Sequence, residues 1–212
     1  MHEIGFHAST LGAAELYMGE EYLFSLIGRA EFAIVNCNYH FTHKGLINKV
    51  EPYLILKYGR HRVGITGVGP ELDLASVTVF DPVMALERTA AILKAEKNCD
   101  FVICLAQLGF QGDALNNKAL AEQSSNVDFV VGGQNGVPSR QSHGTSVVKN
   151  KDGYDVFLSH TAADAQVLNH TTVSSNKTVE VKTRIPGVAA VSQTAFELAK
   201  INSEMLKNTT DA

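Results

Sequence analysis

The clearest pattern of apolar and polar positions lies between Cys99 and Gly136. Segments 101–105 and 127–131 are short, apolar and rich in β-branched residues, as is typical of parallel strands covered on both faces. Segment 114–123 between them contains helix-forming residues with apolar positions on one side. We therefore predict a strand, a helix and a second strand, with a glycine-containing turn after each strand.

Further segments on both sides of this stretch have the patterns of strands and helices. Apolar or β-rich runs bounded by turn residues predict strands over 32–37, 53–58, 62–68, 145–148, 156–159, 166–173 and 178–183. The segments after residue 136 are expected to pair as antiparallel hairpins. Helical spacing predicts a helix over 22–27 and another that begins at Asp81 and Pro82, and residues 11–15 are interpreted as a small-residue turn.

Composition limits the classes of function. The chain has 212 residues, 45% of them hydrophobic, which is enough for one globular domain with a core. Its net charge of −4 comes from well-mixed charges, and no apolar run reaches the ~20 residues that span a bilayer, so neither nucleic acid nor a membrane is expected as a partner. Cys37, Cys99 and Cys104 lack metal-binding or CxxC spacing and are expected to be reduced thiols. The absence of a signal-peptide pattern favours the cytoplasm.

Histidine spacing does not match a known zinc pattern. His143, His160 and His170 lie in the β-rich half and could in principle build a metal site, but structural hydrogen bonding is the favoured interpretation. Ser159 and His160 have the residue types of a nucleophile and its base. Because neighbouring residues of a strand point to opposite faces, this pair is not expected to act together.

Polar side chains stand at the two turns that follow the predicted parallel strands. Gln107 follows the first strand, and Gln134 and Asn135 follow the second. In an open α/β sheet, ligands bind just beyond the carboxyl ends of the strands. These neutral amides could form a polar pocket for a weakly polar ligand, or they could satisfy one another and nearby backbone groups.

Five segments carry a resemblance to a known family: IGFHASTLGAAELYMGEEYL, EFAIVNCN, HRVGITGV, FDPVMALERTAAILKAEKNCDFVICLAQLG and NVDFVVGGQNG. In this order they resemble the metallophosphatase domain of the 5′-nucleotidase and UDP-sugar hydrolase family, within the calcineurin-like phosphoesterases. The resemblance implies an α/β/β/α sandwich with mixed sheets, here without the family's first strand–helix segment. It further implies a metallophosphatase-like domain over 1–188 and a C-terminal amphipathic helix and tail over 189–212.

The same resemblance implies two divalent metals at the strand ends, yet the ligand positions are altered. The family's Asp-x-His segment and a further Asp would precede the residues of this chain. The Asn and His of its Gly-Asn-His-Glu motif correspond to Ala13 and Ala14, whereas Glu15 matches the motif. The histidines of its Ser-His and Gly-His-x-His turns correspond to Gln107, Gln134 and Gly136.

These changes predict a protein that binds no cofactor and acts as a binding or scaffold subunit rather than as an enzyme, because methyl groups and neutral amides cannot hold two metal ions. The vestigial pocket would comprise Ala13, Ala14, Glu15, Gln107, Gln134 and Asn135. Glu15 is expected to hold its loop through backbone amides rather than to act in catalysis. One alternative is a metal-dependent phosphoesterase of the 5′-nucleotidase type whose missing ligands come from another chain or segment, and another is nucleotide binding without hydrolysis. The absent first strand and helix predict self-association or a protein partner on that side.

Overall fold

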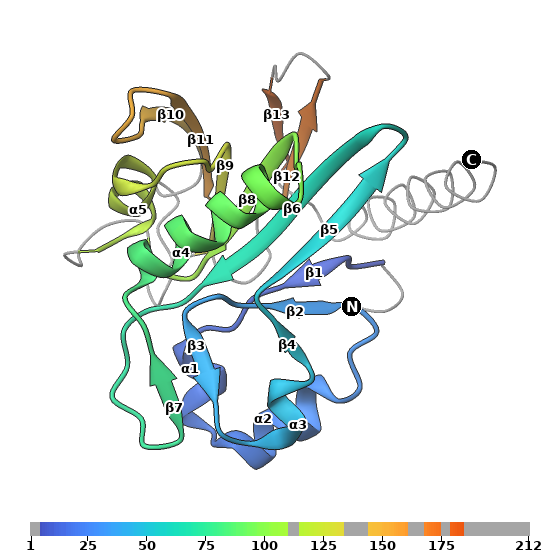
Figure 1. Cartoon of the computed structure of the whole chain (residues 1–212), viewed down its shortest axis with the longest axis vertical. Coiled ribbons are helices and arrows are strands. Elements are labelled where there is room, and N and C mark those ends of the chain that lie inside the picture. Colours follow the sequence, from blue (N-terminus) through green and yellow to red (C-terminus); the bar gives the residue numbers. More distant parts are fainter. Residues whose placement is uncertain (1–4, 110–114, 134–143, 161–167, 175–178, 185–212) are drawn as a thin grey trace.

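A computed structural model of the chain describes residues 5–109, 115–133, 144–160, 168–174 and 179–184 (Figure 1). The predicted helix over 189–212 lies outside the described residues. The helices are α1 (Ala13–Tyr17), α2 (Glu20–Ile27), α3 (Lys44–Ile47), α4 (Pro82–Ala91), which continues as a π-helical segment (η2, Ile92–Glu96), and α5 (Asn117–Gln123). Among these described helices, none combines the length and the apolar character needed to cross a bilayer.

A six-stranded mixed sheet forms the larger half of the described molecule, in the order β10-β11-β9-β8-β6-β5. Its strands are β5 (Tyr53–Tyr58), β6 (His61–Val68), β8 (Phe101–Ala106), β9 (Phe129–Gly132), β10 (Gly144–Lys149) and β11 (Asp155–His160). The four central strands β6, β8, β9 and β11 run parallel, whereas β5 and β10 pair antiparallel at the two edges. This is the predicted α/β class with a mixed sheet, including the predicted strand–helix–strand connection from β8 through α5 to β9, whose two strands pair in parallel.

The remaining strands form three smaller sheets. The strands β1 (Ala8–Ser9), β2 (Ala33–Val35) and β4 (Val50–Glu51) pair in parallel, β3 (Tyr39–Phe41) pairs antiparallel with β7 (Val77–Val79), and β12 (Leu168–Val173) pairs antiparallel with β13 (Val179–Arg184). The pairs β10–β11 and β12–β13 confirm the predicted antiparallel hairpins. Strand β2 also contacts β5 and β6, which joins its small sheet to the large one.

Two hydrophobic cores hold these layers together. The larger core lies between α4, α5 and the large sheet, and its fully buried side chains include Leu86, Leu93, Leu120 and Val130. In Figure 1, α4 lies across the sheet, and α1, α2 and α3 gather beside the small strands at the other end of the molecule. The second core lies there, around residues such as Leu46. Burial of each large aliphatic side chain contributes about 1.5–3 kcal/mol.

The structure corrects several predicted element boundaries. Residues 11–15 are not only a turn, because α1 begins at Ala13. The strand predicted over 32–37 ends at Val35, where the Asn36 side chain accepts hydrogen bonds from the backbone N–H groups of Asn38 and Tyr39 and turns the chain. The helix predicted over 114–123 begins at Asn117.

Local capping signals explain the elements that were predicted well. Asp81 accepts a hydrogen bond from the N–H of Met84 at 2.7 Å, and Pro82 is the first residue of α4, as predicted. Tyr58 pairs with His61, so Gly59 and the next residue form a two-residue hairpin turn, one residue shorter than the gap between the predicted strands 53–58 and 62–68. Gly59 has a φ of +57°, a conformation that favours glycine.

Candidate functional site

The carboxyl ends of the parallel strands lie at the same level of the large sheet. Val68 of β6 pairs with Ala106 of β8, Ala106 pairs with Gly132 of β9, and Gly132 pairs with His160 of β11. Gln107 is therefore the first residue beyond this row in β8, and its backbone N–H donates to the carbonyl oxygen of Val68 at 3.0 Å. This edge is the place at which the sequence predicts chemistry.

The beginning of α1 lies close to this edge, next to the side chain of Gln107. A Cβ atom at Gly12 would lie 3.5 Å from Cδ of Gln107, and a Cβ atom at Gly133 would lie 3.6 Å from its Nε2. The Gln107 side chain thus lies beside both glycines, one before α1 and one after β9. Gln134 and Asn135, the other amides of the predicted pocket, lie outside the described residues.

Glu15 is held in the first turn of α1. Its Oε2 accepts a hydrogen bond from the backbone N–H of Gly12 at 2.9 Å, which satisfies a group that the short helix leaves without a helical partner. The side chains of Ala13 and Ala14, half-buried and exposed, offer only methyl groups. The Glu15 carboxylate therefore binds a backbone amide of its own turn, the contact expected from the sequence.

Tyr39 lies next to this turn and stays a neutral phenol. Burial, and then the negative charge of Glu15, raise the pKa of Tyr39 well above its ordinary value. Its hydroxyl donates to the carbonyl oxygen of Pro70 at 2.9 Å. A Cβ atom at Gly69 would collide with the Tyr39 ring, so the glycine allows the ring to pack against the chain that follows β6.

Asn117 and His160 form a buried pair that the sequence does not predict. Asn117 is fully buried at the start of α5, where its Oδ1 accepts from the N–H of Leu108 at 3.3 Å and its Nδ2 lies 3.4 Å from Nδ1 of His160. Because the Asn117 Nδ2 can only donate, Nδ1 of His160 accepts, which places the proton of the neutral ring on Nε2. Burial lowers the pKa of His160 and favours this neutral form.

The candidate histidine His170 and the candidate nucleophile Ser159 have separate surroundings. His170 is exposed on β12, and His143 lies outside the described residues. Ser159 accepts a hydrogen bond from Asn169 at 2.7 Å, whereas the side chain of His160 contacts Asn117. The side chains of Ser159 and His160 thus have different partners, in agreement with the expectation that they do not act together.

The described residues do not fit a site for two metal ions. Within the part of the chain that the structure describes, no three His, Cys, Asp or Glu side chains come together as possible ligands. Gln107 offers a neutral amide, Ala13 and Ala14 offer no donor, and Glu15 is bonded to Gly12. Carboxylates and imidazoles are needed to offset the charge of two adjacent divalent cations. The three cysteines are free, as predicted. Burial raises the pKa of each thiol, so each stays protonated at neutral pH, and a protonated thiol is a poor metal ligand.

Comparison with known proteins gives matches at the level of structure. No family model and no curated protein matches the sequence. A 5′-nucleotidase precursor from Thermus thermophilus matches with a TM-score of 0.73 and 21% identity, over 95% of this chain and 44% of that chain. The NAD nucleotidase of Haemophilus influenzae matches with a TM-score of 0.70 and 19% identity, over 91% of this chain and 45% of that chain.

A third similar structure is the calcineurin-like phosphoesterase YfkN from Bacillus subtilis, with a TM-score of 0.65 and 20% identity, over 95% of this chain and 73% of that chain. The chain thus spans less than half the length of the two nucleotidases. At these identities the matches show a shared fold.

Proposed function

The chain has the fold of 5′-nucleotidases and calcineurin-like phosphoesterases, and we propose that it is a non-catalytic form that acts as a binding or scaffold subunit. The main observation behind the proposal is that Glu15 stabilises its own turn. The carboxylate beside the strand ends accepts a backbone N–H of its own turn, and its neighbours Ala13, Ala14 and Gln107 carry no charge.

Phosphoester hydrolysis on this fold depends on charge. In phosphoryl transfer, the protein contributes mainly positioning and electrostatic stabilisation, and metal ions generate the attacking hydroxide and neutralise the phosphoryl oxygens. A site of methyl groups and a neutral amide supplies neither function. We therefore expect hydrolysis to be lost even though the strands that would carry the site are intact.

Exposed apolar side chains support a role in binding another protein. Tyr17 is 66% exposed and Leu26 is 51% exposed, on helices that lie together at one end of the molecule. The large apolar side chains exposed on or next to α1, α2 and α3 are Tyr17, Met18, Tyr22, Leu26 and Ile47. Exposed apolar side chains that form a continuous patch commonly mark interaction surfaces. The occupant of this surface would be a protein partner or a second copy of the chain.

Hydrolysis of an aryl phosphate and of AMP tests the proposal. The full chain would be assayed with Mn²⁺, with Zn²⁺ and with a chelator, beside the Thermus thermophilus enzyme as a positive control. We expect no turnover above the metal-only blank under any of these conditions. Metal-dependent turnover that a chelator removes would contradict the proposal and would favour a phosphoesterase with ligands from elsewhere.

A further inference from the structure

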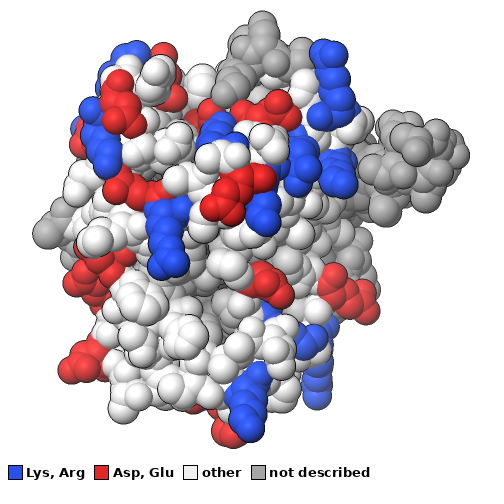
Figure 2. Space-filling view, viewed as in Figure 1, with Lys and Arg blue, Asp and Glu red and all other residues white. Residues whose placement is uncertain are grey.

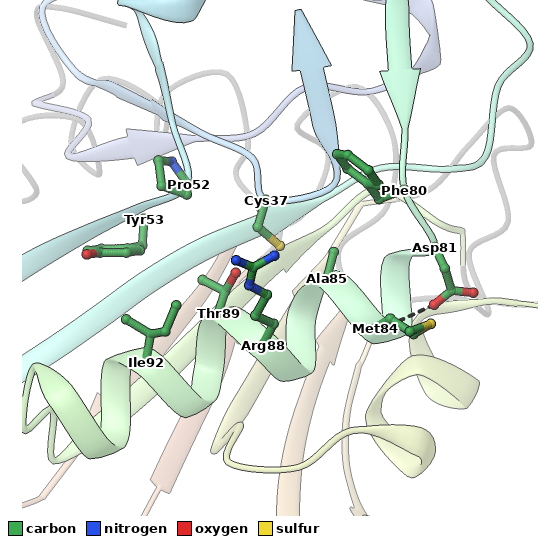
Figure 3. A pocket seen from close by; sticks show the side chains of 10 residues that line it. All are labelled: Cys37, Pro52, Tyr53, Phe80, Asp81, Met84, Ala85, Arg88, Thr89 and Ile92. Carbon is green, nitrogen blue, oxygen red and sulfur yellow. Dashed lines mark hydrogen bonds between the residues drawn. The ribbon is translucent and has the colours of Figure 1, made fainter.

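A groove separate from the strand-end residues lies along α4 (Figure 3). It has a volume of about 530 Å³ and is bordered by one side of α4, by the beginning of β5 and by the segment that precedes α4. The ring of Tyr53 lies at one end, and Phe80 lies at the other. Small-molecule sites in proteins commonly have volumes of about 300–1,000 Å³, so the groove is large enough for a small organic ligand.

The walls of the groove are apolar and remain exposed. Phe80 is 53% exposed and Met84 is 71% exposed, and Ile92 continues the wall about two turns further along the helix. Large apolar side chains at the mouth of a concave surface lose unfavourable contact with water when a ligand covers them. The body of the ligand should therefore be aromatic or branched aliphatic.

The floor of the groove is uncharged. Cys37 lies there, and burial raises the pKa of its thiol, so the sulfur stays protonated at neutral pH. The hydroxyl groups of Thr66 and Thr89 are hydrogen-bonded to the same thiol. The floor thus offers polarisable, neutral atoms to an apolar ligand. It offers no negative charge that would bind a cationic ligand.

One cation reaches into this apolar groove. In Figure 3 the guanidinium group of Arg88 extends toward Cys37 and Thr89, between the Tyr53 and Phe80 ends. Within the described residues, Arg88 forms no ion pair, and Glu87, the acidic residue beside it in sequence, is paired with Lys151. An arginine with free donors next to an apolar wall is suited to bind a carboxylate through two parallel hydrogen bonds.

An anion at the far end of the groove narrows the choice of ligand. Asp81 lines the groove about two helical turns before Arg88, where its Oδ1 caps α4 by accepting the N–H of Met84 at 2.7 Å. Its negative charge disfavours a second anionic group at that end of a ligand. On the face shown in Figure 2, acidic and basic side chains are interspersed. Attraction of an anionic ligand would therefore depend on Arg88 rather than on a broad positive surface.

We propose that this groove binds a small organic monocarboxylate, with its carboxylate on Arg88 and its aromatic or branched aliphatic body against Tyr53, Phe80 and Ile92. This site is independent of the strand-end residues and of the proposed loss of hydrolysis. A dicarboxylate of similar size and inorganic phosphate bind less well, because the first places charge beside Asp81 and the second leaves the apolar walls exposed.

Calorimetry and ligand-observed NMR on the full chain test the site with 3-phenylpropionate as the probe. The neutral alcohol 3-phenylpropan-1-ol, phenylsuccinate and inorganic phosphate serve as comparisons. We expect the monocarboxylate to bind about tenfold more tightly than the alcohol, as for a charge-assisted hydrogen bond. R88Q should remove this difference. R60Q, which changes an exposed arginine of the β5–β6 turn, should retain it.

A second measurement locates the probe. Methyl signals of Met84, Ala85 and Ile92 should shift on addition of 3-phenylpropionate, and the A85L variant, which fills the groove, should weaken binding while circular dichroism stays unchanged. Equal binding of acid and alcohol, equal binding to R88Q and R60Q, shifts confined to residues near Gln107, or no binding of any probe would each overturn the proposal.

Discussion

The strand-end region and the α4 groove use their polar groups in opposite ways. At the strand ends, Glu15 is bonded to a backbone amide of its own turn, and Asn117 links Leu108 to His160. In the groove, Arg88 forms no ion pair within the described residues and lies against apolar walls. At the strand ends, where this fold class usually binds ligands, the polar groups stabilise the protein itself. In the α4 groove, the charge of Arg88 stays available to a ligand.

The largest expected effect tests how tightly the strand ends are packed. In G132A, the new Cβ atom would collide with the amide of Asn117 and lie 2.9 Å from Nδ1 of His160, so we expect a loss of about 2–3 kcal/mol in the free energy of unfolding. Urea denaturation measures it. G133A is the matched control, because its nearest neighbour beyond the adjacent residues would be Nε2 of Gln107 at 3.6 Å, an ordinary contact.

A loss in G132A no larger than that in G133A would show that the polar groups at the strand ends have room to move. It would also remove the distinction between a closed edge and an open groove, because both regions could then accommodate a ligand.

The next largest effect is removal of the amide that bridges α5 to the strands. N117A leaves the backbone N–H of Leu108 and the imidazole of His160 without this partner, in a fully buried position. We expect a loss of about 1–3 kcal/mol in the free energy of unfolding. N116A, at the half-buried N-cap of the same helix, should cost about 1 kcal/mol. Equal losses would argue against a structural role for the buried bridge.

His160 makes the stability of this region depend on pH. Its pKa is lowered by burial in the folded chain, so the unfolded chain, with the ordinary pKa of about 6.5, binds the proton at higher pH. The stabilisation is full above this unfolded value and is lost as pH falls toward the folded pKa. Thermal unfolding between about pH 7.5 and pH 5 should show a smaller decrease in stability for H160N than for wild type, whereas H170N, at an exposed position, should behave like wild type.

The role of Glu15 can be separated into charge and hydrogen bonding. E15A should lower the free energy of unfolding by about 0.5–1 kcal/mol, because the N–H of Gly12 loses its acceptor. E15Q keeps an acceptor oxygen and should lose less. If E15Q instead lost as much stability as E15A, the carboxylate charge would matter more than the cap, and its use as a structural group would need another explanation.

The smallest expected effect on stability is in the groove. R88Q should change the free energy of unfolding by no more than about 0.5 kcal/mol, because the exposed guanidinium has no ion pair to lose within the described residues. Chemical denaturation of R88Q beside R60Q measures this. A marked loss confined to R88Q would mean that the arginine stabilises the fold, and the contrast between the two regions would be weaker.

The elements that the sequence predicts well have local signals. The cap formed by Asp81 and Pro82, and the hairpin turn at Gly59, depend on a few adjacent residues. The two-residue strands β1 and β4 have no such signal, because they are defined by pairing with β2 across long stretches of chain. The five-residue helix α1 is too short to show helical periodicity and was predicted only as a turn.

The candidate site follows the same division. Gln107 could be placed at the strand ends because its turn follows a recognisable strand, and Glu15 because the segment around it resembles the family's Gly-Asn-His-Glu motif. The contact of Asn117 with His160 joins residues 43 positions apart and depends on the register of β9 with β11, which sequence patterns do not specify. Arg88 had no motif around it, and its importance depends on the shape of the groove.

Metal content measured by mass spectrometry is the most direct test of the proposed loss of metal chemistry. The full chain would be incubated with manganese, zinc and calcium, desalted, and compared with the Thermus thermophilus 5′-nucleotidase treated in the same way. We expect no stoichiometric metal on this chain. Retention of about two metal ions per chain, the number a two-metal mechanism requires, would contradict the proposal.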